Sequence, residues 1–437
     1  MDNVNVRRLK GNRRKLRHVT EAEANNDQWY WPDGEAVDSE QMVLSLLLPP
    51  TVKEFYRRAK AEVEALCGVK GKHTDHSCSR WTTQKGSIHL GAQQVAITHQ
   101  RLRDTGANQE VDLPIYRRFQ EPGLFDRAVF TEGLKRVSQR DYEKGLPKVA
   151  GAFGFSKGSV SKAWIRASQI KLDEMMSRDL RPLDIIAVFI DGKRFRSHGV
   201  VVALGVSSTG KKYVLGIYEA DTENETACLG LLNDIERRGV SSVGIAYVVD
   251  GGSGLNKALE SKYAVHIPEK REAIRLRCHN HKWDNLEKHL KKADRPTIEA
   301  SSLFNAMRLA KSLSVATAHA DSLEALLKRL NQSAMRSFQE AREDLLMIHR
   351  LELSDDLHRL FSTTNPIESL NSITEEDMRR VKRWRDSAHF QRWCATMSLN
   401  AEKRMRRVRG HRGLLGLRQR ILGLCSPTAV DRMKAVA

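Results

Sequence analysis

At 437 residues the chain is longer than one ordinary domain, and about two to four folded units are expected. The 73 lysines and arginines against 54 aspartates and glutamates give a formal charge of +19, which favours a polyanion partner such as nucleic acid over a generally solvated basic surface. No stretch approaches the roughly 20 apolar residues of a membrane span, and the stretch 42–48 ends in two prolines, unlike a signal peptide. The six scattered cysteines are typical of reduced intracellular thiols and exclude a disulfide framework.

The first part of the chain predicts a basic arm, a helix and a hairpin. Basic residues run up to Arg17 and are expected to form an arm along phosphates. Apolar residues at helical spacing predict a helix over 51–66. The segments 87–90 and 94–98 flank Gly91 and predict a β-hairpin.

Four residues in this region invite a zinc interpretation: Cys67, His73, His76 and Cys78. A zinc knuckle needs a Cys-x2-Cys pair and a second pair of ligands, and neither is present. We therefore expect loop residues here, with zinc as the weaker alternative.

A helix-turn-helix pattern follows. One helix is predicted over 142–153, Gly154 and Phe155 break it, and Ser156 is expected to cap a second helix that runs past Ala167. In a helix-turn-helix the second helix would present four polar side chains to a major groove: Lys157, Ser159, Ser161 and Lys162. The alternative is an ordinary pair of antiparallel helices packed on the core, and the basic charge of the chain tips the balance slightly to DNA.

Two apolar runs that each end on an aspartate organise the rest of the chain. Residues 185–190 form a continuous apolar, partly β-branched run before Asp191, and Gly192 is expected to turn the chain there. The run 243–249 ends in the same way on Asp250. Two buried strands that deliver carboxylates to one edge of a sheet predict a divalent metal site.

The segments between these two runs predict an α/β fold. Strands over 200–206 and 213–219 are separated by a turn, so the first three strands form an antiparallel meander. A helix over 226–238 ends at Gly239 and makes the strand before Asp250 parallel to the first strand. This order of elements is the layout of the ribonuclease H-like fold.

A third carboxylate is expected from a helix beside the sheet, and Glu368 is the candidate. Asn365 would cap that helix, Pro366 would occupy its first position, and Glu368 would lie in the first turn. The same spacing is a capping-box pattern, in which Glu368 only binds the backbone of Asn365, and local chemistry leaves both interpretations open. Residues 300–350 are rich in helix formers and predict an all-helical insertion.

Two further patterns lie on either side of the insertion. Cys278 and His281 form a Cys-x2-His pair, which is half a zinc site and more typical of a structural role. The tail from residue 378 is basic, with Trp384 and Trp393 among the charges. It predicts either a face that follows phosphates or a solvated basic helix whose tryptophans lie in the core.

Taken together, these motifs resemble the Mutator-type transposases of bacterial insertion sequences over about residues 65–400. The resemblance rests on motifs that keep their order: Asp191-Gly-Lys-Arg-Phe, Val202-Ala-Leu-Gly, Val214-Leu-Gly, Thr222-Glu-Asn, Val249-Asp250-Gly-Gly-Ser-Gly-Leu, Arg277-Cys278-x-x-His281-Lys-x-x-Asn285 and Thr364-Asn365-Pro-Ile-Glu368-Ser-Leu-Asn.

The resemblance implies a ribonuclease H-like core with a mixed five-stranded sheet and the catalytic set Asp191, Asp250 and Glu368. It makes Cys278 and His281 a family signature without an assigned role. Relatives often carry a basic residue two turns after the catalytic glutamate. This chain has Glu375 there, and basic residues return only in a pair expected to meet DNA, Arg379 and Arg380.

The implied activity is binding of the element's terminal inverted repeats, cleavage at its ends, and joining of the freed 3′-OH to target DNA. Two Mg²⁺ (or Mn²⁺) ions about 4 Å apart would neutralise charge on the attacking and leaving oxygens, with Asp191 bridging both ions. The implied protein acts on double-stranded DNA as a homodimer or higher oligomer in the bacterial cytoplasm, on the nucleoid. The alternatives are a non-catalytic DNA-binding regulator or domesticated transposase, and a nuclease or Holliday-junction resolvase.

The predicted organisation has six parts. They are a basic arm and helix (1–60), a small β-rich region (61–125), a helix-turn-helix-like DNA-binding region (126–180), the first part of the core (181–280), the helical insertion (281–361), and the Glu368 helix with the basic tail (362–437).

Overall fold

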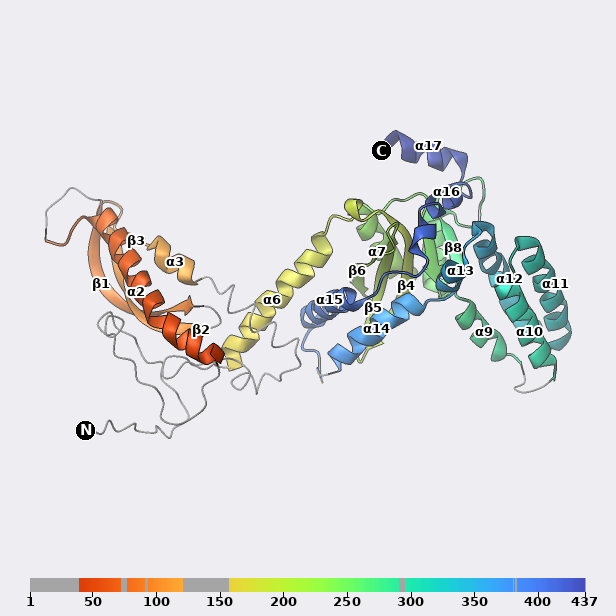
Figure 1. Cartoon of the computed structure of the whole chain (residues 1–437), viewed down its shortest axis with the longest axis horizontal. Helices are drawn as coiled ribbons and strands as arrows, with labels where there is room; N and C mark the ends of the chain where they lie inside the picture. The colour runs from red at the N-terminus through yellow and green to blue at the C-terminus, as the bar shows by residue number, and fades with distance from the viewer. Residues whose placement is uncertain are drawn as a thin grey trace. The chain divides into compact units, whose positions relative to one another are not determined.

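The structure is a computed structural model that describes residues 39–71, 77–90, 93–120, 157–290, 295–379, 381 and 383–436. The chain divides into two compact units, Met1–Ala167 and Ser168–Ala437, and the boundary falls inside helix α6 (Lys157–Ser177) (Figure 1). None of the described helices is long and apolar enough to span a membrane. The six-part division of the chain stays a prediction.

The first unit packs a long helix against a small antiparallel sheet. Its elements are α2 (Ser39–Cys67), β1 (Cys78–Leu90), β2 (Gln93–Asp104), β3 (Glu110–Val111) and α3 (Pro114–Gln120), with strand order β1-β2-β3. Val52 and Phe55 of the helix pack against Ile88, Val95 and Ile97 of the sheet. The predicted helix and hairpin are confirmed, although the helix begins earlier and the hairpin strands are longer.

Several predictions fall on residues outside the described ranges. These are the hairpin turn at Gly91, the zinc candidates His73 and His76, the helix 142–153 and the capping residue Ser156. The second helix of the predicted helix-turn-helix is confirmed as α6, which begins at Lys157.

The second unit is a mixed α/β structure with a five-stranded mixed sheet. Its strands are β4 (Ile185–Phe195), β5 (His198–Ser207), β6 (Lys212–Glu219), β7 (Ala246–Val249) and β8 (Ile274–Arg277), in the order β6-β5-β4-β7-β8. The predicted meander is confirmed by the antiparallel pairing of β4 with β5 and of β5 with β6. The parallel pairing of β4 with β7 is confirmed as well.

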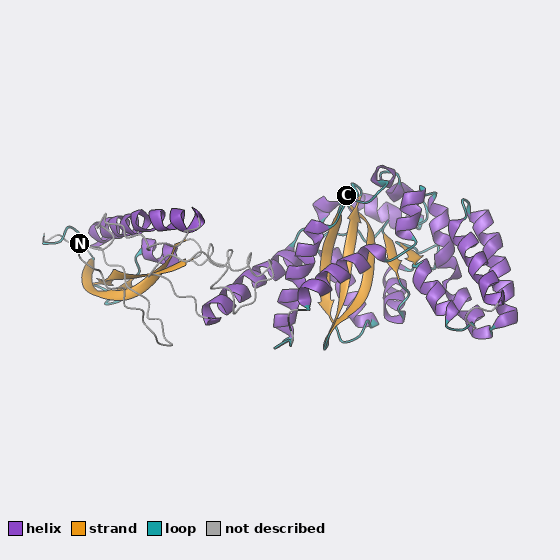
Figure 2. Cartoon of the chain, turned by 60° about the horizontal axis from the view of Figure 1, so that its bottom comes forward, coloured by secondary structure: helices purple, strands orange, loops and turns teal. Residues whose placement is uncertain are grey.

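Helices cover both faces of this sheet (Figure 2). The crossover helix α7 (Glu225–Arg237) ends before Gly239 as predicted, and with α8 (Ser253–Tyr263) it packs on the face that carries Val188 and Ile190. On the other face Phe189 stacks on Phe361 of α13 (Asp355–Phe361) at 6.0 Å between ring centroids.

The first core strand does not end at Asp191, and the predicted turn at Gly192 is wrong. Asp191 pairs with Val202 and Gly192 with Val201, and the strand continues to Phe195. The apolar run marks only the part of the strand that is covered on both faces, because continuous burial stops at Asp191 while backbone pairing with β5 continues.

The predicted all-helical insertion is confirmed between the sheet and Glu368. Its helices are α9 (His279–Glu287), α10 (Arg295–Leu309), α11 (Leu313–Leu330) and α12 (Gln332–Met347), followed by the short η2 (Ile348–Leu351) and α13. Ion pairs join α12 to β8 and to α9: Arg277 of β8 and Lys282 of α9 both reach Glu340, at 3.2 and 2.9 Å, and Arg275 of β8 reaches Asp344 at 2.7 Å.

The C-terminal helices are α14 (Asn365–Met378), α15 (Ser387–Arg404), α16 (Leu417–Leu422) and α17 (Pro427–Val436). Trp384 is buried, donates a hydrogen bond from Nε1 to the Phe195 carbonyl at 3.2 Å, and packs edge-on against Phe390. For Trp384 the interpretation as a core residue is therefore confirmed.

Candidate active site

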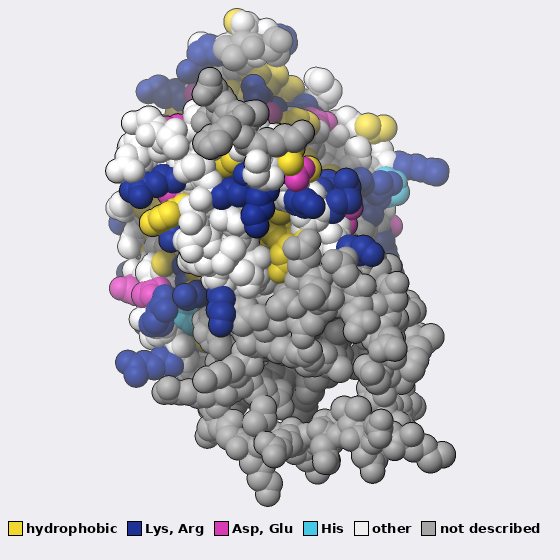
Figure 3. All heavy atoms as spheres, turned by 90° about the vertical axis from the view of Figure 1, so that its left-hand side faces the viewer, with side chains coloured by type: hydrophobic (Ala, Val, Ile, Leu, Met, Phe, Trp, Pro, Cys, Tyr) yellow, Lys and Arg dark blue, Asp and Glu magenta, His cyan; other side chains and the backbone are white. Residues whose placement is uncertain are grey.

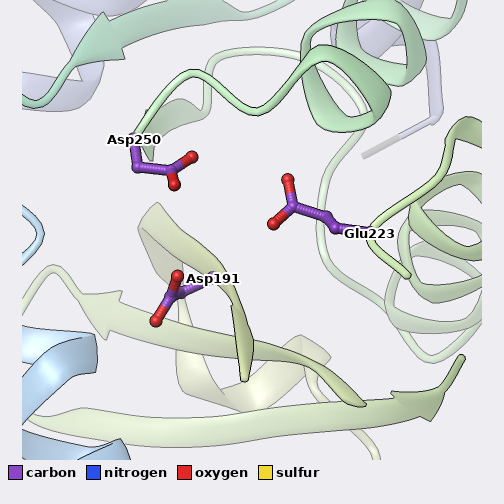
Figure 4. A group of neighbouring side chains, drawn as sticks. All are labelled: Asp191, Glu223 and Asp250. Carbon is purple, nitrogen blue, oxygen red and sulfur yellow. The ribbon is translucent and has the colours of Figure 1, made fainter. Parts of the chain in front are cut away.

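Three carboxylates converge at one edge of the five-stranded sheet. Asp191, Glu223 and Asp250 each offer an oxygen, and these oxygens lie within 4.8 Å of one another (Figure 4). Asp191 comes from the middle of β4 and Asp250 directly follows β7, so the parallel pairing of these strands brings the two aspartates to the same edge. Glu223 precedes Asn224, the residue that caps α7.

Glu223 reaches the cluster because glycines leave room for it. A Cβ atom at Gly192 would lie 2.6 Å from Glu223 Oε2, and Gly252 also lies against this carboxylate. The backbone of Gly192 hydrogen-bonds the Glu223 side chain. The role of Gly192 is therefore close approach to a carboxylate, in place of the turn expected from the sequence.

Burial and neighbouring negative charge raise the pKa values of Asp191 and Glu223. Burial, followed by the charge of Asp250, raises the pKa of Asp191 to about 6, although a hydrogen bond from Asn371 Nδ2 to Asp191 Oδ2 at 2.7 Å opposes the shift. Burial and the charges of Asp250 and Asp191 raise the pKa of Glu223 to about 7. A cluster of like charges that resists ionisation is stabilised by a bound cation.

The donor set fits a divalent metal ion. All three residues offer carboxylate oxygens, the ligands preferred by hard cations such as Mg²⁺ and Mn²⁺. Glu223 Oε1 is buried and has no hydrogen-bond partner among the described residues. A bound metal ion would give this oxygen a partner, so the cluster is a possible acidic metal site.

Glu368 lies beside this cluster, in the first turn of α14. Its Oε1 accepts a hydrogen bond from the Thr364 hydroxyl at 2.6 Å and lies 3.9 Å from His281 Nδ1. Its charge helps to raise the pKa of Asp191, although it is outside the group of three. The expected cap at Asn365 is wrong: Thr364 is the N-cap and Asn365 begins the helix, one residue earlier than predicted.

The signature pair lies between Glu368 and Asp250. The Thr364 hydroxyl is 3.3 Å from Cys278 Sγ and 3.2 Å from His281 Nδ1. A hydrogen bond with Cys278 raises the pKa of His281 to about 9, with help from the nearby Asp250 and Glu368 charges. Burial opposes ionisation of the Cys278 thiol, but hydrogen bonds from the side chain and backbone of His281 and from the backbone of Thr364 outweigh it and lower the pKa of Cys278.

The residues predicted to meet DNA are not members of the acidic cluster. Lys157, Ser159, Ser161 and Lys162 begin α6, and the Lys162 side chain is exposed. Arg379 is exposed directly after α14, and Arg380 is outside the described residues. Glu375, which stands where relatives often carry a basic residue, forms an ion pair with Lys193 at 3.0 Å.

Glu223 is the residue that sequence reasoning missed. Its signal was the motif Thr222-Glu223-Asn224, in which Asn224 was recognisable as a helix cap. Glu223 lies in a loop after β6, outside any apolar run, so neither periodicity nor a strand end marked it.

Comparison with known proteins gives this site its context. Residues 47–405 match the family model described as transposase, Mutator family. The transposase for insertion sequence element IS905 of Lactococcus lactis subsp. lactis (strain IL1403) is 27% identical over 373 residues, which cover 79% of this chain and 88% of that relative. The transposase for insertion sequence element ISRM3 of Rhizobium meliloti (strain 1021) is 25% identical over 336 residues, 72% of this chain and 76% of the relative.

The match covers most of the chain and includes the sheet, the helical insertion and the acidic edge. Insertion-sequence transposases of this kind are DDE-type enzymes that act on DNA. The chain therefore belongs to the Mutator family of transposases.

Proposed function

We propose that this transposase binds the terminal inverted repeats of its insertion sequence, cleaves at the element ends and joins the freed 3′-OH to target DNA. The cluster of Asp191, Glu223 and Asp250 is the observation that carries the proposal. The strand order β6-β5-β4-β7-β8, with one aspartate on the central strand β4 and another directly after its parallel neighbour β7, supports a ribonuclease H-like catalytic core.

Asp191, Asp250 and Glu368 would hold two Mg²⁺ or Mn²⁺ ions. Bound there, the ions would neutralise charge on the attacking and leaving oxygens of a phosphodiester exchange. Asn371 fixes the direction of the Asp191 carboxylate through its hydrogen bond. Glu223 is placed to act as a further ligand or to orient the first two, since it shares their edge of the sheet.

Contacts with the DNA ends are assigned to α6 and the first unit. Helix α6 would present Lys157, Ser159, Ser161 and Lys162 to a major groove. In the sheet of the first unit Trp81 is 50% exposed, and the guanidinium carbons of Arg101 and Arg103 lie 4.5 and 4.9 Å from its ring centroid. Lys and Arg outnumber Asp and Glu on the face shown in Figure 3, which suits phosphate contacts.

Arg379, which directly follows the Glu368 helix, and Arg380, the next residue in the sequence, are assigned to DNA near the reacting strand. Pairing two element ends before strand transfer requires at least a homodimer.

A strand-cleavage and strand-joining assay tests the proposal. The protein is mixed with labelled duplex copied from the DNA that flanks its own gene, with Mg²⁺ or Mn²⁺, beside Asp250→Ala and the exposed-surface control Glu343→Gln. We expect metal-dependent cleaved and joined products from the wild type and the control, and none from Asp250→Ala.

Two results would contradict the proposal. Tight binding to the flanking repeats without cleavage under any metal would identify a non-catalytic DNA-binding regulator. Cleaved products that are never joined to target DNA would identify a nuclease.

A further inference from the structure

One buried hydroxyl contacts three functional side chains beside the acidic cluster. Thr364 is 1% exposed, and its Oγ1 lies 2.6 Å from Glu368 Oε1, 3.2 Å from His281 Nδ1 and 3.3 Å from Cys278 Sγ. The three partners come from different positions in the chain: Cys278 and His281 begin α9, and Glu368 lies in the first turn of α14.

This hydroxyl is not used as a helix cap. Threonine at an N-cap ordinarily accepts a hydrogen bond from a backbone N–H in the first turn of its helix. Thr364 is the N-cap of α14, yet its side chain makes no such bond. Its side chain is directed to Glu368, His281 and Cys278 instead, so capping does not account for a hydroxyl at this position.

Proton counting fixes the direction of the hydrogen bonds. A hydroxyl has one proton to donate, and the shortest contact, to a carboxylate oxygen, takes it. Thr364 therefore donates to Glu368 Oε1 and is left to accept from the Nδ1–H of His281. The side-chain contacts of Glu368 among the described residues all fall on Oε1, which leaves Oε2 for another ligand.

Backbone hydrogen bonds connect this hydroxyl to the aspartate strand. The amide of Cys278 donates to the carbonyl of Val249, the residue before Asp250, at 2.8 Å. The amide of His279 donates to the carbonyl of Ser362, two residues before Thr364, also at 2.8 Å. The start of α9 therefore ties the end of β7 to the start of α14.

We propose that Thr364 is a positioning residue for the active site: its hydroxyl holds Oε1 of Glu368 so that Oε2 faces the metal site formed with Asp191 and Asp250. Cys278 and His281 hold the hydroxyl in place, which gives the signature pair a physical role. The inference rests on the proposed function, because it takes Glu368 as the third metal-binding carboxylate.

The physical need for such a residue follows from the exposure of Glu368. Its side chain is 46% exposed, whereas the other carboxylates are held by the sheet and its edge loops. A mobile glutamate loses conformational freedom when it binds a metal, and a pre-formed hydrogen bond lowers that cost. Removing an outer partner of this kind ordinarily weakens metal affinity by about 10- to 100-fold.

The test compares variants at Thr364 in the full-length protein. Thr364→Val removes the hydroxyl at nearly constant shape, Thr364→Ala removes it without a second methyl against Cys278, and Thr364→Ser keeps it. The dissociation constant for Mn²⁺ is measured by electron paramagnetic resonance, and the half-saturating Mn²⁺ concentration is measured in the cleavage assay. We expect both values to rise about tenfold or more in the Val and Ala variants, and Ser to restore them to within about threefold of the wild type.

A double-variant experiment separates positioning from general loss of structure. Thr364 acts through Glu368, so adding Thr364→Val to Glu368→Gln should leave Mn²⁺ binding no weaker than in Glu368→Gln alone. A further loss in the double variant, or wild-type Mn²⁺ binding in Thr364→Val, would overturn the positioning role.

Failure of the underlying assignment has a different signature. If Glu368→Gln binds Mn²⁺ and cleaves like the wild type, the assignment of Glu368 as a metal ligand is wrong, and the role of Thr364 is wrong with it. If Glu368→Gln is impaired while Thr364→Val is not, the positioning role alone is wrong.

Discussion

Asp191 is a carboxylate whose surroundings oppose its charged form. Burial and neighbouring negative charge raise its pKa to about 6 from an ordinary value of 3.8, so the folded protein binds this proton more tightly than the unfolded chain does. Above pH 6 the ionised group therefore lowers the stability of the metal-free protein, and this loss is relieved as the pH falls from about 6 towards 4.

Replacing this carboxylate with an amide should stabilise the metal-free protein while removing activity. At pH 8, we expect Asp191→Asn to raise the free energy of unfolding by about 1–3 kcal/mol, since the charged form no longer has to be buried. Urea unfolding in the presence of a chelator measures this change. Added Mn²⁺ should stabilise the wild type and leave the variant almost unchanged, and a variant that is less stable at pH 8 would contradict the argument.

Metal binding at the same residues should weaken in mild acid. The pKa values of about 6 for Asp191 and about 7 for Glu223 mean that protons compete with the metal below pH 7. Between pH 8 and pH 6 the dissociation constant for Mn²⁺ should rise by roughly tenfold or more. Titrations at several pH values check this, and Asp191→Asn should show weaker binding with a shallower pH dependence.

At the scale of residues, the sequence predicted Asp191 and Asp250 because each follows an apolar run that only a buried strand explains. Glu223 carried no such mark, because its position depends on a loop and on the space left beside Gly192 and Gly252. Those contacts join residues distant in sequence, and spacing within one chain does not show them. Glu368 was found by its helix start, but its partner Thr364 was not, since Asn365 is the commoner type of cap.

At the scale of elements, ion pairs with the insertion hold the sheet beside Asp250. The Arg277 side chain is 3% exposed and lies against Gly251, and its guanidinium reaches Glu340 of α12. Lys282 reaches the same carboxylate. Glu340 thus neutralises two buried cations from the β8–α9 segment.

Removing this shared carboxylate should destabilise the second unit. We expect Glu340→Ala to lower the free energy of unfolding by about 2 kcal/mol, because it leaves two buried cations without their partner. The matched control is Glu343→Ala on the same helix, whose side chain is 62% exposed and pairs with Arg342 at 3.4 Å. The control should change stability by less than about 0.5 kcal/mol. Equal effects in urea unfolding would show that the pairs of Glu340 contribute nothing special.

Long, periodic elements were the ones that the sequence predicted well. The crossover helix, the meander and the helical insertion all have patterns that repeat over many residues, and each was confirmed. The end of β4 was predicted wrongly, because apolar residues report burial whereas a strand ends where backbone pairing ends. Trp384 was ambiguous in sequence, since its partner Phe195 lies at the distant end of that same strand.

At the scale of the whole molecule, the structure divides the chain into a unit with the small sheet and a unit with the acidic edge. The carboxylates of the cluster, Glu368 and Thr364 all belong to the second unit. The metal chemistry and the recognition of DNA ends are therefore assigned to different parts of the chain.

A fragment of residues 168–437, the second unit, should separate these two properties. It lacks the four residues at the start of α6 that are assigned to the DNA ends and contains the complete five-stranded sheet, so we expect cooperative unfolding and the same Mn²⁺-dependent stabilisation as the full chain. Its preference for element-end duplex over a scrambled duplex should disappear, while salt-sensitive binding to both remains. Fluorescence anisotropy at several salt concentrations measures both, and a fragment that still prefers the ends would place recognition in the second unit.

The distance along the chain between Asp250 and Glu368, 118 positions, also orders events during translation. The small sheet of the first unit and the strands that carry both aspartates leave the ribosome before α14 has been made. On the proposed assignment, a growing chain can occupy DNA well before it can cut it, and a product truncated ahead of Asn365 binds without cleaving. Synthesis of the last helices then completes the active site. Incomplete chains would compete with the finished transposase for the same DNA ends.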